Sequence, residues 1–110
     1  MMIDNKSLIS KAFFTFNKEA PEQAEAWGKL IQDVSRASAL DEKTKALAYL
    51  AVLAVLRMES GIPFHVQSAK KSGASREEII SAILVGLPAA GHVVTQVLPI
   101  ALESYDLRDE

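Results

Sequence analysis

The sequence contains two histidines, His65 and His92, the side chains whose charge changes most readily near neutral pH. His65 falls near the start of a predicted helix, where Gly61 and Ile62 are its neighbours four and three positions earlier. Glu59 stands just before that helix, where the helix dipole favours a carboxylate. This grouping is compatible with a general base, His65, beside an acid, Glu59, in a small pocket. It is also compatible with a half-buried histidine and an exposed glutamate, which is the commoner arrangement.

The remaining residue types exclude several kinds of chemistry. The sequence has no cysteine, which rules out disulfides, thiolate metal sites and a thiol nucleophile. It has no phosphate loop, no Gly-x-Ser-x-Gly elbow and no dinucleotide fingerprint. A metal site would need His65, His92 and a carboxylate without any familiar ligand spacing, so we expect neither a metal nor a cofactor. His92 lies among apolar residues, which is more typical of a core or interface histidine than of a site residue.

Length, charge and composition bound the class of protein. The 110 residues fit a single domain, residues 1–110. Twelve basic and fourteen acidic residues give a net charge of −2, which argues against nucleic acid or an anionic membrane surface as a partner. The first residues show no basic region followed by an apolar run, so a cytoplasmic protein is expected.

Apolar residues recur at helical spacing throughout, and no stretch alternates with period two, so the sequence predicts an all-α fold. About six helices are expected, at residues 7–16, from 21 to about 38, from 42 to before 60, from 63 to about 72, from 76 to before 88, and about 91–105. Residues 17–20 are predicted as a turn, and Pro99 as a kink in the last helix.

Local signals fix several helix ends. Asp41 is a good N-cap, because its carboxylate can accept the free N–H groups of the first turn. Gly73 can adopt the left-handed backbone conformation that commonly ends a helix. Ser75 and Glu78 form a capping box that starts the next helix.

Two apolar stretches indicate more hydrophobic surface than one small core hides. Residues 46–56 are apolar without interruption, and a helix that is apolar on every side needs neighbours on every side. Residues 79–102 contain no charged side chain and are long enough to span a bilayer. Pro88, Gly91 and the polar residues within that segment favour a core hairpin of two helices instead, and we expect no membrane span. Both stretches predict an oligomer.

Residues 40–102 contain three features in a characteristic order. These are an N-capped apolar helix, a histidine near the start of the next helix, and a capping box preceded by glycine. The matching residues are Leu40-Asp41-Glu42-Lys43-Thr44-Lys45, Leu50-Ala51-Val52, Leu56-Arg57, Phe64-His65-Val66 with Ala69, and Gly73-Ala74-Ser75-Arg76-Glu77-Glu78-Ile79. This stretch resembles the carboxymuconolactone decarboxylase and alkylhydroperoxidase D-like superfamily. The resemblance implies an all-helical homotrimer or homohexamer with active sites at subunit contacts.

The peroxidase branch of that superfamily uses the motif Glu-x11-Cys-x-x-Cys-x-x-x-His, in which two cysteines form the redox pair. Laid on this sequence, the motif falls on Ala46, Met58, Gly61 and His65. Only the histidine is present, so a thiol-dependent peroxidase is not expected.

The decarboxylase branch needs neither cysteine nor cofactor, and it implies a lyase acting on a small carboxylate or lactone. Loss of carbon dioxide needs a cation or hydrogen-bond donors for the developing enolate and a proton donor at carbon. His65 is the candidate acid–base, with Glu59 beside it, and Arg57 is the candidate for holding a carboxylate. Arg57 also fits a second role, at the C-terminal end of the preceding helix, where cations are favoured. A proton-transfer enzyme, a non-catalytic oligomeric scaffold and a binder of small apolar ligands remain alternatives.

Overall fold

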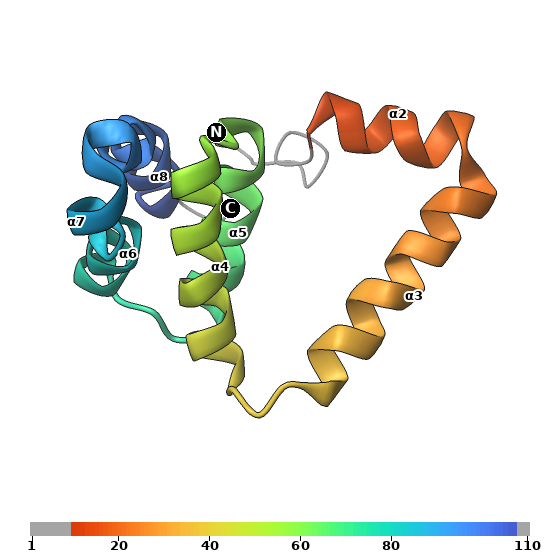
Figure 1. Ribbon diagram of the computed structural model, residues 1–110, viewed down its shortest axis with the longest axis horizontal. Coiled ribbons are helices and arrows are strands. Elements are labelled where there is room, and N and C mark those ends of the chain that lie inside the picture. Colours follow the sequence, from red (N-terminus) through yellow and green to blue (C-terminus); the bar gives the residue numbers. More distant parts are fainter. Residues whose placement is uncertain (1–9, 108–110) are drawn as a thin grey trace.

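Two groups of helices make up the molecule, which is seen in a computed structural model that describes residues 10–107. The first two helices form an arm, and the others form a core from which the arm projects (Figure 1). The arm consists of α2 (Lys11–Glu19) and α3 (Pro21–Ala37). The core consists of α4 (Glu42–Leu56), α5 (Ile62–Lys71), α6 (Arg76–Leu84), α7 (Leu87–Ala90) and α8 (Leu98–Tyr105), with 3-10 turns at Glu59–Gly61 and Gly91–Val97. No strand occurs in residues 10–107, so the predicted all-α fold is confirmed.

The arm begins with a capped helix. The Ser10 hydroxyl accepts a hydrogen bond from the Phe13 amide at 3.1 Å, and α2 then runs to Glu19. The predicted turn over residues 17–20 is therefore wrong in most of its length. Asn17 does not break the helix, because its amide side chain donates to the Phe13 carbonyl one turn earlier, at 2.9 Å. The predicted helix start at residues 7–9 lies outside the described residues.

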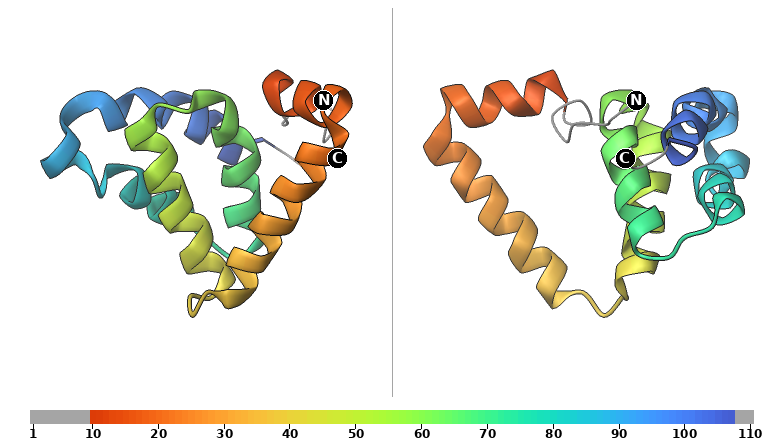
Figure 2. Two further views of the ribbon diagram at one scale, coloured as in Figure 1. Left: turned by 45° about the vertical axis from the view of Figure 1, so that its right-hand side comes forward. Right: turned by 180° about the vertical axis from the view of Figure 1, so that it is seen from behind.

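Helix α3 starts with Pro21 in its first turn, as predicted, and buries only one of its seventeen residues, Ala24. Helices α2 and α3 pack on each other but make few contacts with the core. Both views in Figure 2 show that α3 and α4 lead away from the short connection between them in different directions. The arm is therefore a projecting unit whose side chains are mostly open to solvent.

A short elbow at residues 38–41 joins the arm to the core. Asp41 caps α4, as predicted, by accepting a hydrogen bond from the Thr44 amide at 2.8 Å. Lys45, on the first turns of α4, reaches back to α3 and donates to both the carbonyl and the hydroxyl of Ser35, at 3.2 and 2.7 Å. These bonds tie the end of α3 to the start of α4 and set the angle between arm and core.

Helix α4 is the central element of the core and packs on α5 and α6. Leu50, Leu53 and Ala54 are buried there together with residues of α5, α6 and α8. The expectation that neighbours surround this apolar helix is met on one side only. Val52 and Leu56 remain exposed, at 53% and 60% of their surface.

The predicted start and stop of α5 and the predicted start of α6 are confirmed, whereas α6 ends at Leu84, earlier than the predicted end before Pro88. Helix α5 has Pro63 in its first turn and ends before Gly73, whose φ of 98° provides the left-handed stop. Ser75 and Glu78 form the predicted capping box at the start of α6.

The predicted sixth helix over residues 91–105 is not a single helix. Helix α6 ends at Leu84, α7 has four residues, and a 3-10 segment runs from Gly91 to Val97 before α8 begins. Gly91 has a φ of 76°, which interrupts the helical path, and Pro99 lies in the first turn of α8 rather than kinking a longer helix. Residues 10–107 thus contain five helices of nine residues or more, rather than about six.

The segment Arg76–Tyr105 is long and apolar enough, by length and composition, to cross a membrane. It does not form one straight rod, because the turns around α7 fold it back so that α6 and α8 pack on each other. Its buried residues join those of α4 and α5 in one hydrophobic cluster. The predicted core hairpin therefore describes this segment.

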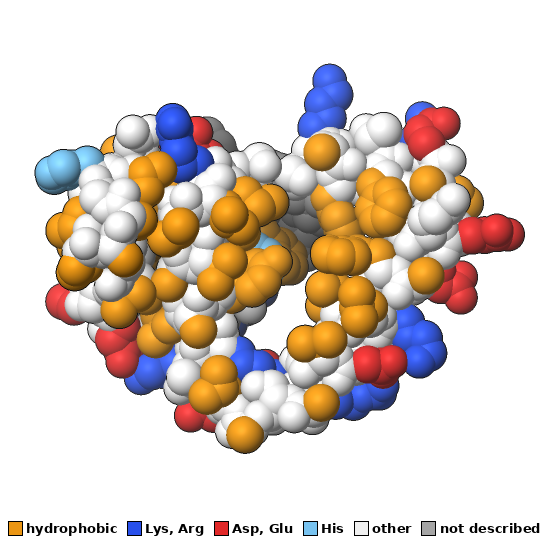
Figure 3. Space-filling model, viewed as in Figure 1, with side chains coloured by type: hydrophobic (Ala, Val, Ile, Leu, Met, Phe, Trp, Pro, Cys, Tyr) orange, Lys and Arg blue, Asp and Glu red, His pale blue; other side chains and the backbone are white. Residues whose placement is uncertain are grey.

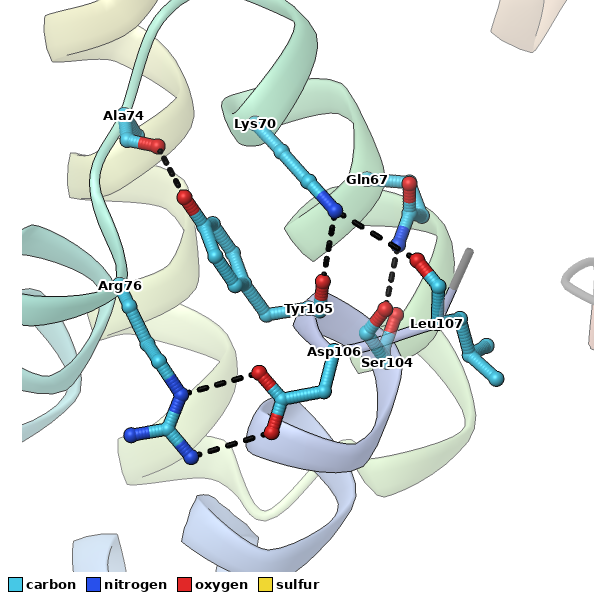
Figure 4. A network of polar contacts seen from close by, with 8 residues as sticks. All are labelled: Gln67, Lys70, Ala74, Arg76, Ser104, Tyr105, Asp106 and Leu107. Atoms are coloured by element: carbon cyan, nitrogen blue, oxygen red, sulfur yellow. Dashed lines mark hydrogen bonds and ion pairs between the residues drawn. The ribbon is translucent and has the colours of Figure 1, made fainter. Parts of the chain in front are cut away.

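Polar bonds fasten the end of α8 to α5 and to the loop before α6 (Figure 4). The buried Gln67 side chain donates to the Ser104 carbonyl, and the Ser104 hydroxyl donates to the Pro63 carbonyl at 3.0 Å. The Tyr105 hydroxyl donates to the Ala74 carbonyl at 3.1 Å, and Lys70 donates to the Tyr105 carbonyl at 2.8 Å. The last carbonyls of α8 thus find donors, as the free end of a helix requires.

Candidate functional site

His65 lies in the first turns of α5, half-buried between two aromatic rings. Its ring centroid is 4.5 Å from that of Tyr49 on α4, at a tilt of 47°, and 5.3 Å from that of Phe64, nearly edge-on at 80°. Burial lowers the pKa of His65, because the charged imidazolium loses hydration there. The ring is therefore predominantly neutral near pH 7 and can accept a proton.

The chain before His65 brings backbone close to the imidazole. The 3-10 turn Glu59–Gly61 is closed by a hydrogen bond from the Gly61 amide to the Met58 carbonyl at 3.0 Å. A Cβ atom at Gly61 would lie 4.0 Å from Cδ2 of His65 and 3.7 Å from a methyl group of Leu53. Gly61 is thus an immediate neighbour of the ring, as the spacing of the two residues predicted.

Glu59 and Arg57 lie in the loop that leads to His65, and both are exposed. No hydrogen bond joins the side chains of Arg57, Glu59 and His65 to one another. The structure therefore places these three predicted residues near each other along the chain without linking them directly. Their assignment to a common site stays a prediction.

Arg57 has the left-handed backbone conformation, with φ of 55° and ψ of 40°, at the C-terminal cap of α4. It is the one residue other than glycine with a positive φ in residues 10–107. This conformation costs an L-amino acid about 1–2 kcal/mol, and a helix end of this kind usually carries glycine. The predicted location of Arg57 at the end of this helix is confirmed.

His92 is exposed in the 3-10 segment, and its carbonyl accepts a hydrogen bond from the Thr95 hydroxyl at 2.8 Å. The expectation of a core histidine is wrong for a single chain, and an interface role stays a prediction. Residues 10–107 contain no group of three or more His, Asp or Glu side chains able to hold a metal ion.

Tyr49 and Phe64 contact His65, and neither was predicted as a site residue from the sequence. Tyr49 is the only aromatic residue within the apolar stretch 46–56, and Phe64 directly precedes His65. The sequence signal for Tyr49 was a single aromatic side chain within an otherwise aliphatic stretch. Together with Leu53 and Gly61, the two rings give His65 an apolar surround that is open to solvent on one side.

A groove of about 580 Å³ lies between α4 and α6, away from His65. Its lining is mostly small and apolar, with Glu77 and Glu78 at one end. Glu78 is already engaged there by the capping box and by an ion pair with Lys43 at 2.9 Å, and both interactions lower its pKa. This groove therefore offers an apolar surface rather than a set of catalytic groups.

Comparisons with known proteins agree with this fold. No curated protein matches the sequence. Among solved structures, the apo form of a carboxymuconolactone decarboxylase family protein from Legionella pneumophila is similar, with 29% sequence identity and a TM-score of 0.74. The similarity covers 86% of this chain and 85% of that one. Residues 21–103 match the carboxymuconolactone decarboxylase family itself, a range that includes α3 as well as the core. The chain therefore belongs to the carboxymuconolactone decarboxylase family.

Proposed function

We propose that the protein is a cofactor-free enzyme, a decarboxylase or proton-transfer catalyst, that acts on a small carboxylate or lactone with His65 as its acid–base. The observation that carries this proposal is the position of His65: a half-buried, neutral imidazole between Tyr49 and Phe64 at the start of a helix. A histidine whose pKa lies somewhat below neutrality takes up and releases protons with little cost.

The proposed decarboxylation needs one proton and no redox step. The bond between the substrate carbon and its carboxylate breaks, carbon dioxide leaves, and the electron pair remains on the substrate as an enolate. Because the resting ring is neutral, His65 first takes up a proton from solvent and then donates that proton to carbon, which returns the ring to its neutral form. The burial that lowers the pKa of His65 makes the protonated form a stronger acid.

Arg57 and Glu59 are assigned supporting roles in the same proposal. Arg57 holds a substrate carboxylate through its guanidinium group, and its left-handed backbone directs the chain into the turn before His65. Glu59, in that turn, exchanges protons between solvent and His65. Thiol peroxidase activity is not expected, because the sequence contains no cysteine.

The test is a screen of small lactone carboxylates for release of carbon dioxide, followed by substitution of His65. We expect His65→Asn to lower turnover by about 100-fold or more, the usual contribution of a positioned acid–base. His92→Asn is the matched control, because it removes the other imidazole from an exposed position and should leave turnover unchanged. Full activity in His65→Asn would rule out the proposed role.

A second candidate is a non-catalytic protein that binds small apolar ligands or serves as an oligomeric scaffold. The apolar surround of His65, made of Tyr49, Phe64 and Leu53, favours it. Calorimetry with small aromatic carboxylates separates the candidates. Binding that His65→Asn does not weaken, together with no turnover in the screen, would support the binding protein.

A further inference from the structure

The proposed reaction needs one group that no residue described so far supplies. When carbon dioxide leaves, negative charge develops on the enolate oxygen of the substrate, and a hydrogen-bond donor placed at that oxygen lowers the barrier. His65 delivers the proton to carbon, and Arg57 is assigned to a carboxylate. The donor for the enolate oxygen therefore has to be another group beside His65.

The backbone at the start of α5 does not offer this donor. The amides of Gly61 and Ile62 each donate to the carbonyl three residues earlier, within the 3-10 turn. Pro63, the next residue, has no N–H group. A backbone oxyanion site needs amides that point freely at the ligand, and these three residues have none to give.

The hydroxyl of Tyr49 is a donor that the fold does not use. Its ring centroid lies 4.5 Å from that of His65, and the residue is exposed by 44% of its surface. Within residues 10–107 no hydrogen bond engages this hydroxyl. The hydroxyl of the other tyrosine, Tyr105, donates to the Ala74 carbonyl at 3.1 Å. The phenol of Tyr105 therefore serves the fold, whereas that of Tyr49 is free to meet a ligand.

The nitrogen atoms of His65 are also without a hydrogen-bond partner in residues 10–107. In the same part of the chain no buried side-chain nitrogen or oxygen lacks a partner, so the free nitrogens of His65 reach solvent. The Cδ2 edge of the ring faces Gly61, and the edge that carries Nδ1 faces away from it. Two polar groups, a phenol and an imidazole, thus lie side by side and both are accessible.

The surface around this pair is apolar. Hydrophobic side chains line the core side of the opening between core and arm (Figure 3). Val52 on α4 and Phe64 on α5 are exposed hydrophobic residues of the core. Tyr49 is the one residue with a side-chain donor in the stretch 46–56, where an aliphatic residue would pack equally well. Apolar neighbours lower the local dielectric, which strengthens a hydrogen bond to a developing charge.

We propose that Tyr49 is a second catalytic residue, whose hydroxyl donates a hydrogen bond to the enolate oxygen while His65 protonates the enolate carbon. The assignment rests on the proposed function, because it needs a reaction that forms an enolate. The electron pair of the broken bond to the carboxylate stays on the substrate, and the new proton on carbon comes from His65. The phenol keeps its own proton throughout.

The first test removes the hydroxyl and keeps the ring. Tyr49→Phe should lower kcat by about 100-fold with little change in KM, because the lost hydrogen bond strengthens only as charge develops. It breaks no hydrogen bond within residues 10–107, so the thermal unfolding midpoint should stay near that of the native protein. Tyr105→Phe is the matched control, since it makes the same chemical change at the other tyrosine and should leave kcat unchanged. A native kcat in Tyr49→Phe would overturn the assignment.

The second test measures binding and does not depend on turnover. Tetronic acid is a small lactone that carries an enolate oxygen at neutral pH, and butenolide is the same ring without that oxygen. By calorimetry, Tyr49→Phe should weaken the binding of tetronate by about tenfold or more, the usual value of a hydrogen bond to a charged group. Its affinity for butenolide should stay native. Native affinity for tetronate in Tyr49→Phe would count against the proposal, as would a native protein that prefers butenolide.

The pKa of His65, measured by NMR, separates a hydroxyl that touches the substrate from one that acts through the imidazole. Tyr49→Phe should leave this pKa as in the native protein, because no hydrogen bond joins the two side chains. A shifted pKa together with a lower kcat would refute direct contact with the substrate, since Tyr49 would then act through His65.

This inference and the proposed function fail separately. If His65→Asn lowers turnover and Tyr49→Phe does not, the proposed function stands and the role of Tyr49 falls. If no lactone carboxylate releases carbon dioxide, the proposed function falls. Binding of tetronate that depends on the Tyr49 hydroxyl would then still support this group as a donor to an oxyanion.

Discussion

At the scale of single residues, the Tyr49 ring, 4.5 Å from the imidazole of His65, matters as much as the imidazole itself. The structure records no hydrogen bond from another described residue to the His65 side chain, so packing alone orients it. The cause of its lowered pKa is likewise burial rather than a nearby charge.

The pH dependence of stability follows from that lowered pKa. Folded His65 binds protons less readily than unfolded His65, so acid favours the unfolded state. Its destabilising contribution is absent above the ordinary histidine pKa of about 6.5, grows as the pH falls from there towards the lower folded pKa, and is complete below that value. Urea unfolding at pH 7.5 and pH 5 should show that His65→Asn loses less stability on acidification than the native protein does. Equal losses in both proteins would contradict this account.

Tyr49 is expected to act on the pKa of His65 through its ring. Tyr49→Ala opens one side of His65 to water and should raise the pKa of His65 towards its ordinary value, as followed by NMR titration. Tyr49→Phe keeps the ring and should leave that pKa nearly unchanged. If both variants shift the pKa equally, the hydroxyl rather than the ring governs His65.

At the scale of elements, the start of α5 tests how the peroxidase motif maps onto this chain. The Gly61 backbone, with φ of −89° and ψ of −15°, suits any L-residue, and a Cβ there would meet its neighbours at ordinary distances. Gly61→Cys should therefore fold, with its thiol close to His65.

Together with Met58→Cys, the Gly61→Cys change should create a pair of thiols that forms a reversible disulfide. The thiol introduced by Gly61→Cys should titrate below the free-cysteine value of about 8.5, because it lies at a helix N-terminus. Adding Ala46→Glu would restore the fourth residue of the motif, and weak peroxide turnover with a dithiol reductant is the expected outcome. If the thiol titrates like a free cysteine and no disulfide forms, the assignment of Met58 and Gly61 to the redox positions is wrong.

The anchor of α8 rests on the buried side chain of Gln67. Its amide donates to the carbonyl of Ser104, which also accepts a hydrogen bond from the Leu107 amide at 3.2 Å. Gln67→Leu removes the side-chain donor, and because this bond is buried the free energy of unfolding should fall by about 1–1.5 kcal/mol in urea titrations. Arg76→Gln breaks only the exposed pair with Asp106 and should lower the free energy of unfolding less than Gln67→Leu does, because solvent screens that pair. Equal costs would mean that burial does not decide the strength of this anchor.

The sequence predicted those elements whose signals are local. The N-cap at Asp41, the stop at Gly73 and the capping box at Ser75 depend on residues within one turn of each other, and all are confirmed. Residues 85–97 have closely spaced glycine and proline, and spacing alone could not show whether they kink one helix or divide it. The division into α7, a 3-10 segment and α8 is set by packing against α4 and α6.

The candidate site could be predicted only in part, because some of its contacts join different helices. The neighbourhood of Gly61 and His65 follows from helical spacing, and the structure confirms it. The contact between Tyr49 and His65 joins two helices, and a single sequence gives no sign of which residues meet across helices.

At the scale of the whole molecule, the sequence indicated too much apolar surface for one small core, and the structure shows where that surface lies. The exposed apolar side chains of α3, which are Trp27, Leu30, Ile31 and Val34, have the same spacing whether they pack on their own core or on another chain. Its spacing therefore could not reveal that the arm projects. The hydrogen bonds from Lys45 to Ser35 hold the arm in its projecting position. They join two helices, so the spacing of residues along one helix does not predict them.

That α3 buries only Ala24 has a consequence for the exchange of backbone hydrogens with solvent. A helix with so little burial opens without disturbing the core, so its amides are exchangeable through local fraying rather than through global unfolding. Deuterium should therefore enter α3 well before it enters α4, whose Leu50 and Ala54 are fully buried. Similar exchange rates in α3 and α4 would instead show that α3 is covered in solution.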